Sequence, residues 1–234
     1  PQVLERYAAK GVRVADSDED IPPGAAVVIR AHGVPRQVEE SLHERGARVV
    51  DATCPRVKKA QVLIRRNVER GRRLLLYGEQ DHPEVCGLLS YAGDDAVVFA
   101  DREEFDALVL EPGVGYVLAA QTTQDREEFD AMAEELLARE DRDVEVLHTI
   151  CDATRMRQME AVDIAKRADA MVVVGGRNSG NTRRLALVAG QHTPTVHVDT
   201  VDELPLDELR GKAVIGLTAG ASTPSDLVDA VRRA

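Results

Sequence analysis

Two cysteines of this chain occur in closely similar settings. Cys54 lies in DATCPRVKKAQ and Cys151 in TICDATRMRQ, each between an apolar run and a basic helical pattern. Both thiols are therefore expected at the carboxyl ends of strands. Single cysteines that a fold brings together can ligate an iron–sulfur cluster, since thiolate is the preferred ligand of that soft centre. The alternative for either cysteine is a small buried apolar residue, and the spacing leaves both interpretations open.

The third cysteine, Cys86, makes the total odd in a chain whose first residues, PQVLERYAAKG, have no export signal. An odd number argues against a disulfide framework and favours metal or redox chemistry. None of the cysteines has the C-x-x-C spacing of zinc ribbons. Cys86 follows HPEV on a predicted helix, where we expect a buried packing residue.

Histidines and a glutamate follow two other apolar runs. His32 in AHGVP and His82 in DHPEV lie in predicted loops, where an imidazole can bind phosphate. Glu84 would occupy the first turn of the next helix, where the helix dipole already favours a carboxylate. To serve as a proton donor it would need a raised pKa. We expect the remaining histidines to be structural or exposed; they are His43, His148, His192 and His197.

Small polar residues follow the last apolar runs. Ser179 and Asn181 lie in GGRNSGNTRRL and Ser222 lies in TAGASTP, all at predicted helix starts. Such residues cap helices, and a phosphate bound at a helix N-terminus would use the same geometry. Neither segment matches the Walker A pattern or a clean G-x-G-x-x-G, so a nucleotide site is only weakly indicated.

Strand-like apolar runs alternate with helical patterns along the whole chain, which indicates an α/β fold with parallel sheets. Polar loops follow the strands: AHGVP, GEQDHPEV, QTTQD, GGRNSGNT and TAGASTP. In such sheets the ligand binds at the carboxyl ends of the strands. We expect three similar units packed around a common centre, with boundaries at residues 1–54, 55–150 and 151–234.

The bulk composition narrows the possible partners. The 234 residues include 41 Asp and Glu against 30 Lys and Arg, a net charge of -11, which gives no electrostatic reason to expect a nucleic-acid partner. No run approaches the roughly 20 apolar residues of a membrane span. We expect a cytoplasmic protein that contacts neither nucleic acid nor membrane.

The motifs AHGVP, DATCP, DHPEV, QTT, TICDATRMRQ, RNSGNT and TAGASTP, in this order, closely resemble the 4-hydroxy-3-methylbut-2-enyl diphosphate reductase family. The resemblance runs from about residue 1 to the C-terminus and is specific as a combination. It implies a trefoil of three α/β units around a [4Fe-4S] cluster held by three cysteines. It also implies two-electron reductive dehydroxylation of an allylic diphosphate to isopentenyl and dimethylallyl diphosphate, with a ferredoxin or flavodoxin type electron donor.

The resemblance also implies residue roles. Cys54 and Cys151 match two cluster ligands, Glu84 matches the proton donor, and Thr122 in QTT matches the hydroxyl that holds the substrate. The diphosphate clamp is matched by His32, His82, Ser179, Asn181 and Ser222.

Three departures from the family pattern qualify these roles. The family has a further cysteine and a histidine near its N-terminus that this chain lacks, so we expect a truncated first unit and a cluster without its third thiolate. Gly180 stands where some members carry a serine. We further expect an exposed sheet edge and exposed apolar surface, with low stability or solubility.

Two other functions fit the same residues. One is a non-redox diphosphate-binding protein, or an inactive fragment of the reductase, with the same fold. The other is a zinc- or thiol-based metal site formed by Cys54, Cys86 and Cys151.

Overall fold

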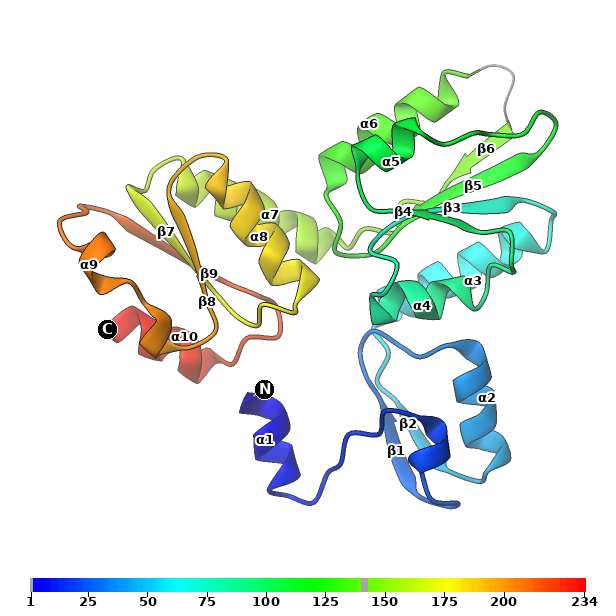
Figure 1. Cartoon of the computed structure of the whole chain (residues 1–234), viewed down its shortest axis with the longest axis horizontal. Coiled ribbons are helices and arrows are strands. Elements are labelled where there is room, and N and C mark those ends of the chain that lie inside the picture. The colour runs from blue at the N-terminus through cyan, green and yellow to red at the C-terminus, as the bar shows by residue number, and fades with distance from the viewer. Residues whose placement is uncertain (1, 140–142) are drawn as a thin grey trace. The chain divides into compact units, whose positions relative to one another are not determined.

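The structure is a computed structural model that describes residues 2–139 and 143–234. The chain divides into two compact units. We call Val14–Cys151 the central unit, and Asp152–Ala234 with Pro1–Arg13 the C-terminal unit. Figure 1 labels the helices and strands of both.

A two-stranded parallel sheet opens the central unit. It pairs β1 (Ala26–Ile29) with β2 (Arg48–Asp51), and α2 (Arg36–Glu44) connects the two strands. A short 3-10 helix, η1 (Asp18–Asp20), precedes β1. Only Ile29 and Leu42 of these strands and helices are fully buried hydrophobic residues, so this subdomain has a small core.

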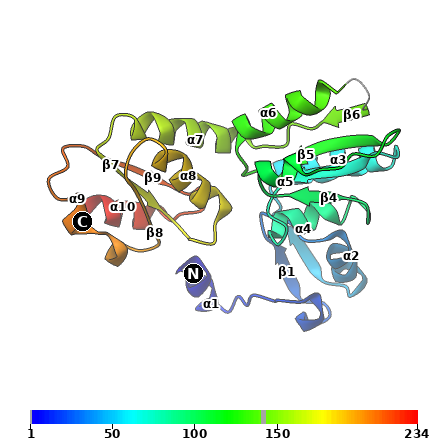
Figure 2. The same ribbon diagram turned by 45° about the horizontal axis from the view of Figure 1, so that its top comes forward.

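The main sheet of the central unit has four parallel strands in the order β4-β3-β5-β6. Its strands are β3 (Arg73–Tyr77), β4 (Val97–Phe99), β5 (Gly115–Ala120) and β6 (Asp143–Val146). Its helices are α3 (Pro55–Val68), α4 (Pro83–Leu89), α5 (Arg102–Asp106) and α6 (Arg126–Leu137). Figure 2 shows helices on both faces of this sheet.

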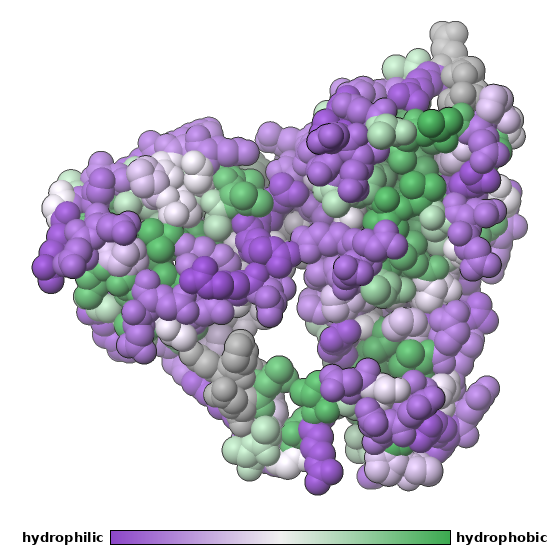
Figure 3. All heavy atoms as spheres, in the orientation of Figure 1, coloured by the Kyte–Doolittle hydropathy of each residue, from purple (hydrophilic) through white to green (hydrophobic). Residues whose placement is uncertain are grey.

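Each face of the main sheet has its own core. Alternate residues of β3 point to opposite faces: Leu75 and Tyr77 pack with α5 and α6, whereas Leu74 and Leu76 pack with α3 and α4. Burial on both faces explains why the strand segments are continuously apolar. In Figure 3 apolar side chains gather over the strands of this sheet.

The C-terminal unit repeats the same architecture around a three-stranded parallel sheet in the order β8-β7-β9. Its strands are β7 (Ala170–Val174), β8 (Thr195–Val198) and β9 (Ile215–Ala219). Its helices are α1 (Gln2–Ala8), α7 (Asp152–Ala165), α8 (Gly180–Gly190), η2 (Val201–Glu203), α9 (Leu206–Leu209) and α10 (Ser225–Arg233). An ion pair between Arg6 and Asp226 joins α1 to α10.

These sheets confirm the predicted α/β class with parallel strands. Every strand pair in the described residues is parallel, as expected for strands that alternate with covering helices. The boundaries at residues 54 and 150 remain a prediction. Within the same described ranges, no helix is both long enough and apolar enough to cross a membrane.

Candidate functional site

Cys54 lies beside the loop that carries His32. Its backbone N–H donates to the Ala31 carbonyl at 2.9 Å, because parallel β1 and β2 end at the same edge. Cys54 is the N-cap residue of α3, but its side chain makes no capping hydrogen bond, and Pro55 needs no N–H partner. The half-buried thiol is therefore left available for another ligand.

His32 and His82 come together from different loops. Their ring centroids lie 5.2 Å apart with the planes at 74°. His82 caps α4, and its Nδ1 accepts the Glu84 N–H at 3.1 Å, so the neutral ring carries its proton on Nε2. His32 is exposed, yet partial burial of its ring, followed by the charge of Arg30, lowers its pKa below 6.5. The lowered pKa of His32 favours its neutral ring, and the His82 ring, which accepts at Nδ1, presents its Nε2 as the hydrogen-bond donor.

Glu84 is a buried carboxyl group that bonds to Thr122. Its side chain is 1% exposed, and its Oε1 accepts the Thr122 N–H at 2.6 Å. Its Oε2 accepts the Thr122 hydroxyl at 2.8 Å. Burial raises the pKa of Glu84 above its usual 4.5, and the two bonds from Thr122 oppose this shift without cancelling it. The group is thus suited to hold its proton to a higher pH than an exposed glutamate does.

Cys151 extends this connected series of residues. Its N–H donates to the Thr122 carbonyl at 3.1 Å, and its thiol is half-buried just before α7. Six predicted site residues of the central unit thus form a connected series, in which each contacts the next either directly or through the residue beside it in the chain. They are Cys54, His32, His82, Glu84, Thr122 and Cys151.

The thiols of Cys54 and Cys151 fit an iron–sulfur cluster in kind, since both are partly accessible and neither thiol makes a hydrogen bond with the residues that the structure describes. Across residues 2–139 and 143–234, however, no group of three or more His, Cys, Asp or Glu residues is placed to hold a metal ion. Cys54, Cys86 and Cys151 are therefore not gathered around one metal position within these ranges.

The expectation that Cys86 is buried is wrong. Cys86 is exposed, and its Sγ donates to the Gln80 carbonyl at 3.7 Å. Along α4 the buried residues include Glu84, Val85 and Leu88, and at 100° per residue the side chain of Cys86 turns outward. A small apolar side chain identifies a possible core residue but not the side of the helix that faces the core.

The C-terminal unit carries the remaining predicted residues. Ser179 caps α8 by accepting the Thr182 N–H at 3.4 Å, as expected. Asn181 does not cap: it is buried, and both polar atoms of its amide lack partners among the described residues. An unpaired buried polar group costs about 1–3 kcal/mol. The amide is therefore a candidate ligand-binding group.

Ser222 is not at a helix start. It is exposed in the turn after β9, while α10 begins at Ser225 with Pro224 as its N-cap. Pro224 has extended backbone angles and fixes where the helix starts, so the serine is left two positions before the cap. The hydroxyl is free of a capping role.

Sequence reasoning missed Thr182, which joins the loops after β7 and β9. A Cβ on Gly220 would lie 2.1 Å from Thr182 Oγ1, and one on Gly175 would lie 3.1 Å from it. Thr182 is buried, and its hydroxyl has no hydrogen-bond partner in the described chain. The glycines of the GG and TAG segments were the available signal in the sequence, since glycine permits close backbone approach.

The role of Asp51 in the turn that presents Cys54 was also not predicted from the sequence. Asp51 accepts the Thr53 N–H at 2.9 Å and pairs with Lys58 at 2.8 Å. Burial raises the pKa of Asp51, but hydrogen bonds from Lys58 and Thr53 outweigh it and lower the pKa to about 2.

The other predicted histidines behave as expected: His43, His148 and His192 are exposed, and His197 bonds the Gly175 carbonyl at 2.7 Å.

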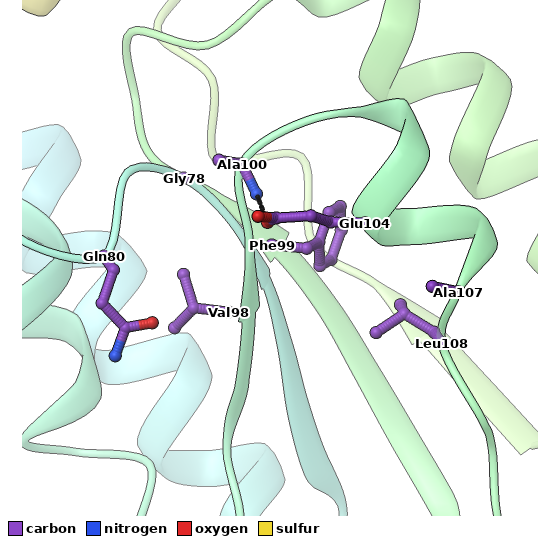
Figure 4. A pocket seen from close by; sticks show the side chains of 8 residues that line it. All are labelled: Gly78, Gln80, Val98, Phe99, Ala100, Glu104, Ala107 and Leu108. Carbon is purple, nitrogen blue, oxygen red and sulfur yellow. Dashed lines mark hydrogen bonds between the residues drawn. The ribbon is translucent and has the colours of Figure 1, made fainter.

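A pocket of about 330 Å³ lies elsewhere in the central unit, against β4 and α5. Figure 4 shows that the Ala100 N–H donates to Glu104 there, at 2.7 Å. Its lining residues are Gly78, Gln80, Val98, Phe99, Ala100, Glu104, Ala107 and Leu108. This pocket contains no predicted site residue. The candidate site is therefore defined by the side-chain contacts described above.

The fold and these residues define a class: a parallel α/β protein with accessible thiols, a buried carboxyl whose pKa is raised, and imidazole and amide N–H groups suited to an anion. The model of the LytB protein family matches residues 1–234, and the chain belongs to this family.

Similar proteins agree with this assignment. A 4-hydroxy-3-methylbut-2-enyl diphosphate reductase of Nitratidesulfovibrio vulgaris strain Miyazaki F is 59% identical over 234 residues, which cover 100% of this chain and 83% of the relative. The reductase of Syntrophotalea carbinolica is 43% identical over 99% of this chain and 82% of its own length.

Two solved structures share the fold. The E-1-hydroxy-2-methyl-but-2-enyl-4-diphosphate reductase of Plasmodium falciparum matches with a TM-score of 0.92 at 25% identity, covering 99% of this chain and 73% of that one. A second, (E)-4-hydroxy-3-methyl-but-2-enyl diphosphate reductase, the terminal enzyme of the non-mevalonate pathway, matches with a TM-score of 0.66 at 36% identity, covering 100% of this chain and 83% of that one. This likeness confirms the fold class implied by the sequence motifs.

Proposed function

We propose that this chain catalyses the reduction of 4-hydroxy-3-methylbut-2-enyl diphosphate to isopentenyl and dimethylallyl diphosphate. The reaction consumes two electrons and two protons and releases the allylic hydroxyl group as water. The observation that carries the proposal is the buried Glu84–Thr122 pair, held between His82 and Cys151. The reductases related to this chain support a redox function over diphosphate binding alone.

Glu84 is the proposed proton donor. Its raised pKa keeps a proton available, and the 2.8 Å contact between Oε2 and Thr122 Oγ1 provides a path through the threonine hydroxyl. The same hydroxyl would orient the substrate hydroxyl that leaves as water. Burial excludes bulk water from the carboxyl and so keeps the proton from exchanging freely.

Neutral groups would bind the diphosphate. His32 and His82 offer ring N–H groups, and Asn181 offers an amide N–H that has no partner in the described chain. Ser179 and Ser222 add hydroxyls, the first at the N-terminus of α8, where the helix dipole favours an anion. A built site is required because the chain as a whole, at net charge -11, repels anions.

Cys54 and Cys151 would hold a [4Fe-4S] cluster as two of its thiolate ligands. Such a cluster supplies single electrons and a Lewis-acidic iron for the leaving hydroxyl. The expected third thiolate has no counterpart among the described residues of this chain. A ferredoxin or flavodoxin type protein would deliver the electrons, and the cytoplasm is the expected compartment.

The test is anaerobic reconstitution with iron and sulfide, followed by iron content, labile sulfide and turnover. We expect Cys54→Ser to lower bound iron and the exposed control Cys86→Ser to leave it unchanged. Glu84→Gln should keep the iron and lose turnover by about 100-fold or more, since it removes the proton donor. Absence of bound iron in the wild-type chain, or full turnover in Glu84→Gln, would contradict the proposal.

A further inference from the structure

Helix α3 and the turn after it are unusually basic for this chain. Between Arg56 and Arg73 the sequence holds eight basic residues and one acidic residue, a local charge of +7 within a chain of net charge -11. The positive charge is therefore concentrated on one segment, while the rest of the chain is strongly acidic.

Three of these basic side chains form what we call the α3 basic stripe: Lys59, Arg66 and Arg70. All three are exposed. Lys59 and Arg66 are seven residues apart and so point within about 20° of each other around the helix. Arg70 lies in the turn just after α3. The opposite side of α3 packs into the sheet, with Ala60 and Ile64 buried in the core.

The charges of the stripe are not neutralised within the described chain. Neighbouring basic residues do have acidic partners: Lys58 pairs with Asp51, Arg65 with Glu69, and Arg72 and Arg73 with Asp143 and Glu111. Lys59, Arg66 and Arg70 make no ion pair in the residues that the structure describes. Unpaired charge of one sign along a helix is suited to an oppositely charged partner.

The stripe also begins close to a proposed cluster ligand. Helix α3 starts at Pro55, directly after Cys54. Lys59 is five residues beyond Cys54, about 7.5 Å along the helix axis. A partner seated on α3 would therefore lie against the helix whose N-cap residue carries one of the thiols.

We propose that the α3 basic stripe docks the acidic face of a small electron-carrier protein. The inference rests on the proposed function, because the reaction consumes electrons that the chain itself does not generate. Charge complementarity selects the acidic partner and orients it, since the remainder of the chain repels an acidic surface.

The experiment measures binding of an oxidised, acidic plant-type ferredoxin to the full chain by calorimetry at low and at 0.3 M salt. The test variant is Lys59→Glu with Arg66→Glu. The matched control is Lys166→Glu with Lys212→Glu, which changes the net charge equally at exposed positions of the C-terminal unit. Thermal unfolding of both variants checks that each remains folded.

We expect the test variant to bind at least about tenfold more weakly than wild type at low salt, and the control to change less than about twofold. High salt should weaken wild-type binding and remove the difference, since screening acts over about 10 Å or less. Equal weakening in both variants, or no wild-type binding at low salt, would overturn the proposal. So would preferential binding of a duplex DNA oligomer.

Turnover with a chemical reductant separates this inference from the proposed function. Wild type and the test variant should turn over equally with dithionite and methyl viologen, and differ in the KM for reduced ferredoxin. If no chain turns over with the chemical reductant, the proposed function fails, whereas the equilibrium binding comparison still decides whether α3 is the docking surface.

Discussion

At the scale of single residues, Glu84 and Glu127 show how burial changes the chemistry of one side chain. Both are second residues of a helix, in α4 and α6, where the dipole favours a carboxylate. Glu127 is exposed, whereas Glu84 is buried against Thr122 and has a raised pKa. The same residue type is thus a surface helix-end charge in one helix and a candidate proton donor in the other.

The raised pKa of Glu84 predicts a pH dependence of stability. The folded state holds this proton more tightly than the unfolded state, so stability falls as pH rises from about 4.5 through the folded-state pKa, by up to about 1.4 kcal/mol per pH unit. Glu84→Gln, which can still bond to Thr122, should remove this component. Urea unfolding from pH 4 to 8 measures it.

Glu127→Gln is the matched control, because it changes the same helix position at the surface. Its unfolding free energy should follow that of the wild type across the pH range, apart from a loss of roughly 0.3–1 kcal/mol from the helix dipole. Parallel pH profiles for the wild type and Glu84→Gln would show that Glu84 keeps an ordinary pKa.

At the scale of elements, close backbone approach positions the loops of the C-terminal unit. Gly220 directly follows the last residue of β9, and Thr182 lies in the first turn of α8. Without a Cβ on Gly220, Thr182 Oγ1 fits between the loops that carry Ser222 and Ser179. The separation of two proposed diphosphate-binding hydroxyls thus depends on residues that bind no ligand themselves.

Gly220→Ala is predicted to destabilise the protein by about 1–3 kcal/mol, because the new methyl group would lie 2.1 Å from Thr182 Oγ1. Adding Thr182→Ala removes that atom and should recover most of the loss. Chemical denaturation of the single and double variants measures the coupling between the two positions.

Gly190→Ala provides the control for that pair. A Cβ at Gly190 in α8 would meet nothing closer than 3.9 Å, so this substitution should be neutral or stabilising by up to about 1 kcal/mol. Strictly additive effects of Gly220→Ala and Thr182→Ala would contradict the steric explanation.

At the scale of the whole molecule, the three sheets differ in how much core supports them. The four-stranded sheet has a buried cluster on each face, and the three-stranded sheet is also covered by helices with buried contacts. On the two-stranded sheet, the paired residues Val28 and Val50 are 68% and 60% exposed. Two strands alone are marginally stable, so this sheet is the weakest part of the fold.

Hydrogen exchange should reveal that difference in stability. Backbone amides of β1 and β2 are predicted to exchange at least about 100-fold faster than those of β3 and β5, through local opening that leaves the main sheet intact. Mass spectrometry of exchanged peptides gives the comparison. Equal protection of the two sheets would show instead that the chain unfolds as one cooperative unit.

The amino-acid sequence was enough to predict the α/β class, the order of strands and loops, and the residue types of the candidate site. Apolar runs, helical periodicity and turn residues are local signals, so they survive without tertiary information. For the same reason His32, His82 and Cys54 were correctly expected in or beside loops at the ends of strands.

Which of these residues are buried, and what they contact, is visible only in the folded chain. Four features depend on neighbours distant in sequence: the exposure of Cys86, the Asn181 amide that has no partner among the described residues, the raised pKa of Glu84 and the close approach of Gly220 to Thr182. Desolvation and steric contact are set by those neighbours, and a local pattern of residue types does not contain them.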